Sequence, residues 1–207
     1  MVQISKDRVG WQLAAACVIW VSALLWGAGS LWGHARQPGE AGSAPLFWPQ
    51  QSRIQPEPGL PTLVMMAHPQ CACTKASLCE LARLMTQLQG RLRAFVIFYQ
   101  PAAFPASWVE TDSWQAAHHI PGVTVMRDDG CEASLFRSHT SGQTLLYDAE
   151  GNLRFSGGIT WARAHSGDNA GSTAITEIVL RGSSQQARSP VFGCAIFNQS
   201  SAPEGGK

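Results

Sequence analysis

The stretch that decides the fold is TLVMMA at residues 62–67, followed by HPQCACTK at residues 68–75. An apolar run of this length without polar alternation is typical of a strand that is buried on both faces of a sheet. Residues 75–89 then carry apolar side chains at helical spacing, which predicts an amphipathic helix. The strand and the helix therefore meet at a junction that contains two cysteines, Cys71 and Cys73.

The rest of the domain continues this alternation of strands and helices. Further strands are expected at residues 92–99, 123–127, 143–148 and 153–158, and further helices at residues 111–119, 131–138 and 169–180. Strands that alternate with helices predict a parallel sheet with right-handed crossovers, here finished by an antiparallel hairpin that turns at Gly151. The expected fold class is α/β, with a central mixed sheet flanked by helices, over residues 62–182.

The amino-terminal part predicts a membrane anchor. Residues 11–32 contain no charged side chain, and as a helix they would reach about 33 Å, enough for a hydrocarbon core of about 30 Å. Lys6 and Arg8 precede this transmembrane stretch, so the positive-inside rule places residues 1–10 in the cytoplasm. We expect one pass through the inner membrane with the domain on the periplasmic side; a cleaved signal peptide is the alternative.

Two further segments flank the predicted domain. Residues 33–61 include six prolines and few aliphatic side chains, which predicts a semi-extended tether that buries little surface. The tail at residues 183–207 is polar except for an apolar patch at residues 191–197 around Cys194.

The composition limits the classes of function. Charged residues make up 14% of the chain and the net charge is +1, which argues against a nucleic-acid binder because such a protein needs a basic surplus. The sequence has no phosphate loop, zinc-ligand spacing or nucleophile elbow, so no bound organic cofactor is expected. Cysteine stands out instead, because Cys71, Cys73 and Cys79 lie within nine residues.

The Cys71–Cys73 pair predicts redox chemistry. The junction lies at the carboxyl end of the sheet, where open α/β folds place their sites. Free N–H groups at a helix amino terminus lower the pKa of a thiol, and Lys75 and His68 are expected to add positive charge. We predict thiol–disulfide exchange with protein thiols or disulfides. Cys71, nearer the surface, would be the nucleophile and Cys73 the resolving thiol, although the reverse order stays open.

Four phrases carry a resemblance to a known family: HPQCACTKASL at residues 68–78, SGQTLLYDAEGNLRFSGGIT at residues 141–160, HSGDNAG at residues 165–171 and VFGC at residues 191–194. Together with the order of elements, they resemble the thioredoxin-like superfamily and, within it, membrane-anchored periplasmic proteins of the bacterial RedB-like type. The likeness covers about residues 60–197. It implies a thioredoxin-like fold of the redox-active, oxidoreductase kind.

The sequence departs from that family at two places. The family motif is C-x-x-C, whereas one residue separates Cys71 from Cys73, so a disulfide between them would close a strained ring that is easily reduced. The family also has a cis-proline just before the hairpin, where this chain has Gly142 or Gln143, a departure that bears on how a substrate docks. The residues expected to support the cysteines are His68, Pro69, Thr74, Lys75 and Gln143.

Copper handling is the alternative function. Thiolates are soft ligands that select Cu(I), and Cys71 and Cys73 would supply two of them. His139 precedes the hairpin strand, similar to the place where Sco-type copper chaperones carry a ligand histidine, although those proteins use C-x-x-x-C. The remaining cysteines outside the membrane have other expected roles: Cys79 as a small buried apolar residue, and Cys131 and Cys194 as free thiols or as a pair.

Overall fold

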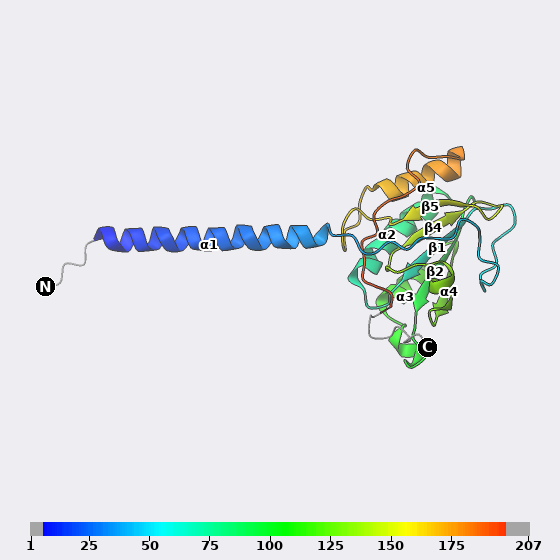
Figure 1. Cartoon of the computed structure of the whole chain (residues 1–207), viewed down its shortest axis with the longest axis horizontal. Helices are drawn as coiled ribbons and strands as arrows, with labels where there is room; N and C mark the ends of the chain where they lie inside the picture. Colours follow the sequence, from blue (N-terminus) through cyan, green and yellow to red (C-terminus); the bar gives the residue numbers. More distant parts are fainter. Residues whose placement is uncertain (1–5, 198–207) are drawn as a thin grey trace, which may run out of the picture. The chain divides into compact units, whose positions relative to one another are not determined.

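The computed structural model describes residues 6–197 (Figure 1). The chain divides into two compact units, Met1–Arg36 and Gln37–Lys207. Residues 1–5 of the expected cytoplasmic segment and residues 198–207 of the expected tail lie outside the described residues.

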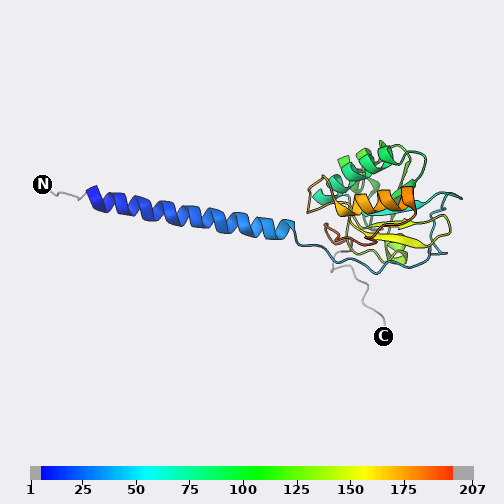
Figure 2. The same ribbon diagram turned by 90° about the horizontal axis from the view of Figure 1, so that it is seen from above.

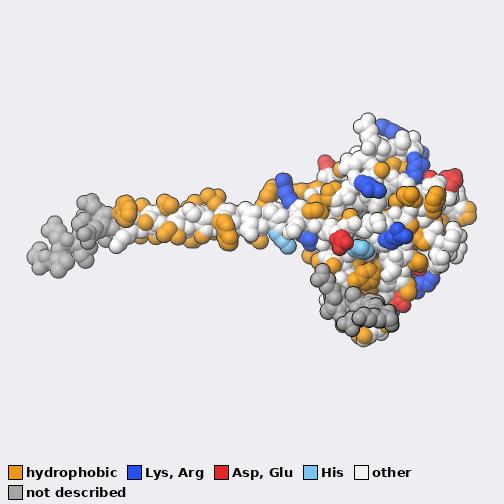
Figure 3. All heavy atoms as spheres, in the orientation of Figure 1, with side chains coloured by type: hydrophobic (Ala, Val, Ile, Leu, Met, Phe, Trp, Pro, Cys, Tyr) orange, Lys and Arg blue, Asp and Glu red, His pale blue; other side chains and the backbone are white. Residues whose placement is uncertain are grey.

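The described part of the first unit contains one helix, α1, Lys6–Ala35. Its stretch Gly10–Ala35 has a mean hydropathy of 1.8, and no residue of its most apolar part is buried within the structure. Figure 3 shows apolar side chains along much of the helix. The helix is therefore long and apolar enough to cross a membrane once, as the sequence predicted for residues 11–32.

The second unit is built on one five-stranded sheet with the strand order β3-β2-β1-β4-β5. The strands are β1 Thr62–Ala67, β2 Arg93–Tyr99, β3 Val123–Asp128, β4 Thr144–Tyr147 and β5 Leu153–Gly157. β1 pairs in parallel with β2, and β2 with β3, whereas β4 runs antiparallel to both β1 and β5. All six residues of β1 are buried, which confirms the prediction of a strand covered on both faces.

Helices cover both faces of this sheet (Figure 2). They are α2 Ala72–Gln87, α3 Asp112–His118, α4 Cys131–Leu135 and α5 Ala170–Arg181, with a short 3₁₀ turn at Ala106–Trp108. Helices α2, α3 and α5 share one apolar core with the sheet. Helix α4 belongs to a second core, and alternate β1 residues contribute to each, so the two cores lie on opposite faces. This arrangement is the expected thioredoxin-like fold.

Helix α2 begins earlier than the sequence pattern predicted. Its first residue is Ala72, because Cys71 takes the N-cap position with φ −92° and ψ 121°. The Thr74 N–H donates to the Cys71 carbonyl at 3.0 Å, which closes the first turn. Cys73 therefore lies inside the helix. The apolar periodicity starts later than the helix does because the first turn buries cysteine and threonine rather than aliphatic side chains.

The segment before β1 packs against the domain. Ile54 is only 2% exposed and belongs to the same apolar core as α4. The Trp48 ring packs edge-to-face on the rings of Phe136 and Tyr147, with centroid distances of 5.2 and 5.1 Å. The prediction that residues 33–61 form a free tether is therefore wrong for the part that lies in the second unit. A few well-placed apolar side chains suffice to anchor an extended, proline-containing segment.

Charged groups fasten the same segment to α4. Arg53 pairs with the buried carboxylates of Asp128 and Glu132 at 3.0 and 3.2 Å. Asp128 also accepts the N–H groups of Glu132 and Ala133, so it satisfies backbone donors at the amino terminus of α4. The hydrogen bond from Arg53 to Glu132 is the main reason why the pKa of Arg53 is raised. The segment thus supplies the cation that two buried carboxylates require.

Replacing Ile54 with alanine tests whether this segment is part of the folded domain. Removal of a buried isoleucine side chain costs roughly 2–5 kcal/mol, so we expect Ile54→Ala to lower the free energy of unfolding by an amount in that range. Leu46→Ala is the matched control, because the Leu46 side chain is 67% exposed, and its effect should stay within about 0.5 kcal/mol. Denaturant unfolding of the detergent-solubilised chain measures both. Equal effects of the two substitutions would contradict the packing.

Candidate active site with three thiols at the start of helix α2

The cysteine pair lies at the predicted place, between the carboxyl end of β1 and the amino terminus of α2. A tight turn connects the two elements, in which the Cys71 N–H donates to the His68 carbonyl at 3.1 Å. The Thr74 hydroxyl donates to the same carbonyl at 2.8 Å and lies 2.9 Å from the Ser141 hydroxyl. Ser141 Oγ also accepts the His68 N–H at 2.9 Å. Thr74 therefore holds the turn before α2, with Ser141 as a partner that the sequence did not reveal.

A third cysteine joins the pair. The Sγ atoms of Cys71 and Cys194 lie 2.8 Å apart, although 123 positions separate the two residues in the sequence. Cys73 is the neighbour with the largest effect on the pKa of Cys71, which it lowers. All six cysteines are free of disulfide bonds in this structure. The alternative in which Cys194 pairs with Cys131 is wrong, since the neighbour of Cys194 is Cys71.

The three cysteine residues differ in their exposure to solvent. Cys71 is 3% exposed and Cys73 is 5% exposed, whereas Cys194 is an exposed residue. The prediction that Cys71 lies near the surface is therefore wrong. The cause is the segment around Cys194, which lies over the start of α2 and places its own sulfur against Cys71.

Hydrogen bonds activate Cys71. The Cys73 thiol donates to the Cys71 sulfur and is the largest cause that lowers the pKa of Cys71, to about 4. Burial opposes this effect, while the Cys194 thiol and the backbone N–H groups of Cys194 and Cys73 lower the pKa further. A thiolate at neutral pH follows, because a hydrogen bond to the charged form favours that form.

The two neighbouring thiols keep their protons. The same hydrogen bond to Cys71, together with burial, raises the pKa of Cys73. Burial is the main cause that raises the pKa of Cys194 to about 11, and the contact with Cys71 adds to it. The cluster therefore holds one thiolate, at Cys71, and two thiols that donate to it.

The predicted cationic neighbours contribute little to this activation. Lys75 is exposed and is not among the main groups that set the pKa of Cys71. Burial lowers the pKa of His68, so the imidazole is neutral at neutral pH. Its ring packs against the Trp108 ring with centroids 5.4 Å apart. Donors from the start of α2 and from the other cysteines take the place of the expected side-chain cations.

Residues 191–196, which we call the C-terminal strap, hold Cys194 in place. The Ser141 N–H donates to the Cys194 carbonyl, and the Ile196 N–H donates to the His139 carbonyl, both at 2.8 Å. Thr140 and Ala195 form an antiparallel bridge between these bonds. The strap therefore pairs with residues 139–141 as an added strand would. Its apolar anchors are Val191, Phe192 and Ile196, all of them buried.

Arg163 is a second residue that the sequence did not single out. Its guanidinium donates to the carbonyls of Gly193 at 2.8 Å and Gln37 at 3.0 Å. Its positive charge also lowers the pKa of Cys194, against the larger effect of burial. Neither contact has a local signal in the sequence. The sequence did carry a signal for Cys194, because the apolar residues Val191 and Phe192 precede it in an otherwise polar tail.

The other predicted supporting residues lie beside the cluster. The Pro69 carbonyl accepts the Thr111 hydroxyl at 3.1 Å, which ties the turn to the start of α3. Gln143 is fully buried, and its Oε1 accepts the N–H groups of Gly42 and His139 at 3.3 Å. Residues 6–197 contain no cis peptide bond, and Gly142 adopts a φ of +88°. Gln143 therefore supports the backbone near His139 rather than the sulfurs.

His139, the third ligand in the copper alternative, has a carboxylate as its neighbour. The His139 ring lies against Glu40, with Nδ1 at 3.3 Å from Oε1. Within the described part of the chain, no group of three or more His, Cys, Asp or Glu side chains is arranged to hold a metal ion. The structure thus brings Cys71 and Cys73 together but shows no contact between His139 and either of them.

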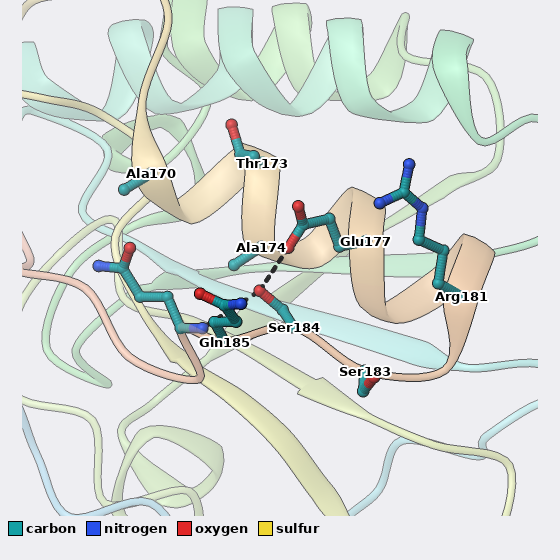
Figure 4. A pocket seen from close by; sticks show the side chains of 9 residues that line it. Ala170, Thr173, Ala174, Glu177, Arg181, Ser183, Ser184 and Gln185 are labelled. Carbon is teal, nitrogen blue, oxygen red and sulfur yellow. Dashed lines mark hydrogen bonds between the residues drawn. The ribbon is translucent and has the colours of Figure 1, made fainter.

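Other features of the domain lie apart from these sulfurs. Cys79 is exposed on α2, so the prediction that it is buried is wrong, because it is not among the residues that the helix buries against the domain. A pocket of about 680 Å³ lies between α5 and residues 183–186 (Figure 4). There the Ser184 hydroxyl donates to Glu177 at 2.7 Å and ties the chain after α5 back to the helix. No cysteine lines this pocket.

The titration of Cys71 can be measured directly. We expect the ultraviolet absorbance of the thiolate to persist on acidification and to disappear as the pH falls through about 4. Cys73→Ala removes the main hydrogen-bond donor, so the transition should move to higher pH. Cys79→Ala, which alters an exposed thiol on the same helix, should leave it in place. The absence of a transition near pH 4 in the unmodified chain would contradict the assignment.

The comparisons with known proteins show a shared fold. No family model and no curated protein matches the chain. A hypothetical protein from Sinorhizobium meliloti is 20% identical, with a TM-score of 0.56, over 77% of this chain and 93% of that one. An uncharacterized conserved protein from Geobacillus kaustophilus is 15% identical, with a TM-score of 0.57, over 81% and 95% of the two chains. A thioredoxin-like protein from Aeropyrum pernix is 16% identical over 78% and 98%, with a lower TM-score of 0.42. The first two matches establish similarity of fold alone, so the function of this chain has to be argued from its own cysteines.

Proposed function

We propose that this chain is a membrane-tethered thiol–disulfide exchange protein of the RedB-like type, in which Cys71 is the nucleophile. One observation carries the proposal. At the start of α2, a thiol whose pKa is lowered to about 4 lies 2.8 Å from a second sulfur. The thiolate is the species that attacks a disulfide, and a nearby thiol can then release the bound partner.

The chemistry needs no cofactor. A thiolate of the cluster attacks one sulfur of a partner disulfide, a mixed disulfide forms, and the other partner sulfur leaves as a thiolate. A second cysteine of the cluster then attacks the chain's sulfur in the mixed disulfide, so that the protein gains a disulfide and the partner gains two thiols. The low pKa makes Cys71 a good leaving group, and it therefore favours the reverse direction, in which the protein oxidises its partner.

The anchor suits this chemistry. Helix α1 is long enough to hold the domain at a membrane, and Lys6 and Arg8 favour a cytoplasmic amino terminus. The domain would then face the periplasm, where disulfides form and persist. The charged side chains on the face drawn in Figure 3 are of both signs and interspersed, in keeping with the net charge of +1. Protein thiols or disulfides are the partners that we propose.

A glutathione titration tests the proposed exchange. The full chain is equilibrated with mixtures of reduced and oxidised glutathione, quenched with acid, alkylated and weighed by mass spectrometry. We expect two thiols to be lost together as the mixture becomes more oxidising, because one disulfide forms. Cys71→Ser should abolish this step, whereas Cys131→Ser, which changes an exposed thiol on α4, should preserve it. If no thiol of the unmodified chain changes state, exchange is not its function.

The proposed orientation has its own test. Cys79 is exposed on the domain, so a membrane-impermeant maleimide added to bacterial spheroplasts should label it from outside. A Cys79→Ser variant serves as the control for labelling at other cysteines. Labelling of Cys79 that appears only after lysis would place the domain in the cytoplasm.

A further inference from the structure

Resting on the proposed function, we propose that the redox-active disulfide joins Cys71 to Cys194 rather than to Cys73, and that Cys194 is the sulfur that external thiols attack. Cys194 thereby becomes a catalytic residue. Neither the spacing of the cysteine pair nor the C-x-x-C pattern of the family predicts this role.

The short distance between the two sulfurs favours a disulfide between Cys71 and Cys194. Cys71 Sγ and Cys194 Sγ lie 2.8 Å apart without a bond between them, and a disulfide needs about 2.05 Å, so a shift of less than one ångström closes the bond. Bridging Cys71 and Cys73 would instead close a ring across a single residue, at the N-cap and second position of a helix. The structure therefore favours the long-range pair.

The strap holds Cys194 in one register. Hydrogen bonds at 2.8 Å on either side of the bridge at Ala195 fix its backbone against residues 139–141. Gly193 fits only because it has no side chain, since a Cβ atom there would lie 1.9 Å from the Ser141 carbonyl oxygen. Arg163 holds the Gly193 carbonyl from another side at 2.8 Å. The residue before Cys194 is thus clamped, and its sulfur is presented to Cys71.

Exposure to solvent indicates which cysteine an external thiolate attacks. Cys71 and Cys73 are 3% and 5% exposed, whereas Cys194 is an exposed residue. Of the two residues that the Cys71–Cys194 bond would join, Cys194 is the exposed one, so we place the attack of an external thiolate on its sulfur. The buried Cys71 is then the leaving group, which suits its low pKa.

The exchange balances in atoms and electrons. A partner thiolate attacks Cys194 Sγ, the Cys71–Cys194 bond breaks, and its electron pair leaves on Cys71 as a thiolate. The mixed disulfide at Cys194 is then attacked on its partner sulfur by a second partner thiolate, which releases the oxidised partner and the Cys194 thiolate. Of the two protons that the partner thiols give up, one goes to Cys194, whose pKa is raised to about 11, and the other goes to solvent. The partner loses two electrons and the protein disulfide gains them.

Cys73 has a different part in this scheme. Its pKa is raised because it donates a hydrogen bond to Cys71, so it stays protonated and stabilises the leaving thiolate. It is a positioning residue in that role. The Cys73→Ala variant should therefore still form the Cys71–Cys194 disulfide, while its Cys71 pKa should rise.

Disulfide mapping tests the proposal. The full-length, detergent-solubilised chain is oxidised with oxidised glutathione, its remaining thiols are blocked, and its proteolytic peptides are identified by mass spectrometry. We expect a linked Cys71–Cys194 peptide in the unmodified chain, in Cys73→Ala and in the control Cys131→Ala. A Cys71–Cys73 disulfide with Cys194 free would overturn the proposal and leave the proposed function standing. If no disulfide forms at all, the proposed function fails together with the inference.

A second measurement identifies the attacked sulfur. The oxidised chain is treated with less than one equivalent of reduced glutathione and quenched with acid at once. We expect glutathione on Cys194 and a free thiol at Cys71. Glutathione on Cys71 would overturn the role of Cys194 as the contact sulfur, even where the Cys71–Cys194 disulfide is confirmed.

Discussion

The site depends on one negative charge, which lies on the Cys71 sulfur beside the protonated sulfurs of Cys73 and Cys194. The carboxyl end of β1 delivers Cys71 to the amino terminus of α2, where backbone N–H groups without helical partners are free to donate. Cys73 and Cys194 keep their protons and donate as well. A second thiolate would be repelled by the first in surroundings where burial already disfavours charge. One activated sulfur with two protonated neighbours is the result.

Burial of that thiolate has two consequences. It removes Cys71 from direct contact with partners, and it also protects a sulfur that would otherwise be prone to oxidation, because susceptibility follows thiolate character and exposure. Both consequences come from the C-terminal strap, which adds a short strand beside residues 139–141. The strap is therefore a part of the site and not a loose tail.

The beginning and the end of the second unit meet beside this site. The Gly39 N–H donates to the Val191 carbonyl at 2.8 Å, and Arg163 donates to the carbonyls of both Gln37 and Gly193. The residues that begin the unit thus help to position the strap that carries Cys194. The placement of one thiol depends in this way on contacts among three segments that are far apart in the sequence.

The sequence by itself determined the elements that rest on local patterns. The buried run of β1, the hairpin turn at Gly151 and the apolar stretch of α1 were all predicted, as was the position of Cys71 where a strand passes into a helix. Such patterns report on a residue and its near neighbours, because helical and strand periodicities involve only a few positions. Only the tertiary structure decided that Ile54 is buried, that Cys79 is exposed and that residues 191–196 cover the cysteine pair. Whether each of these residues is buried depends on segments that are distant in the sequence, and the packing of the whole domain determines where those segments lie.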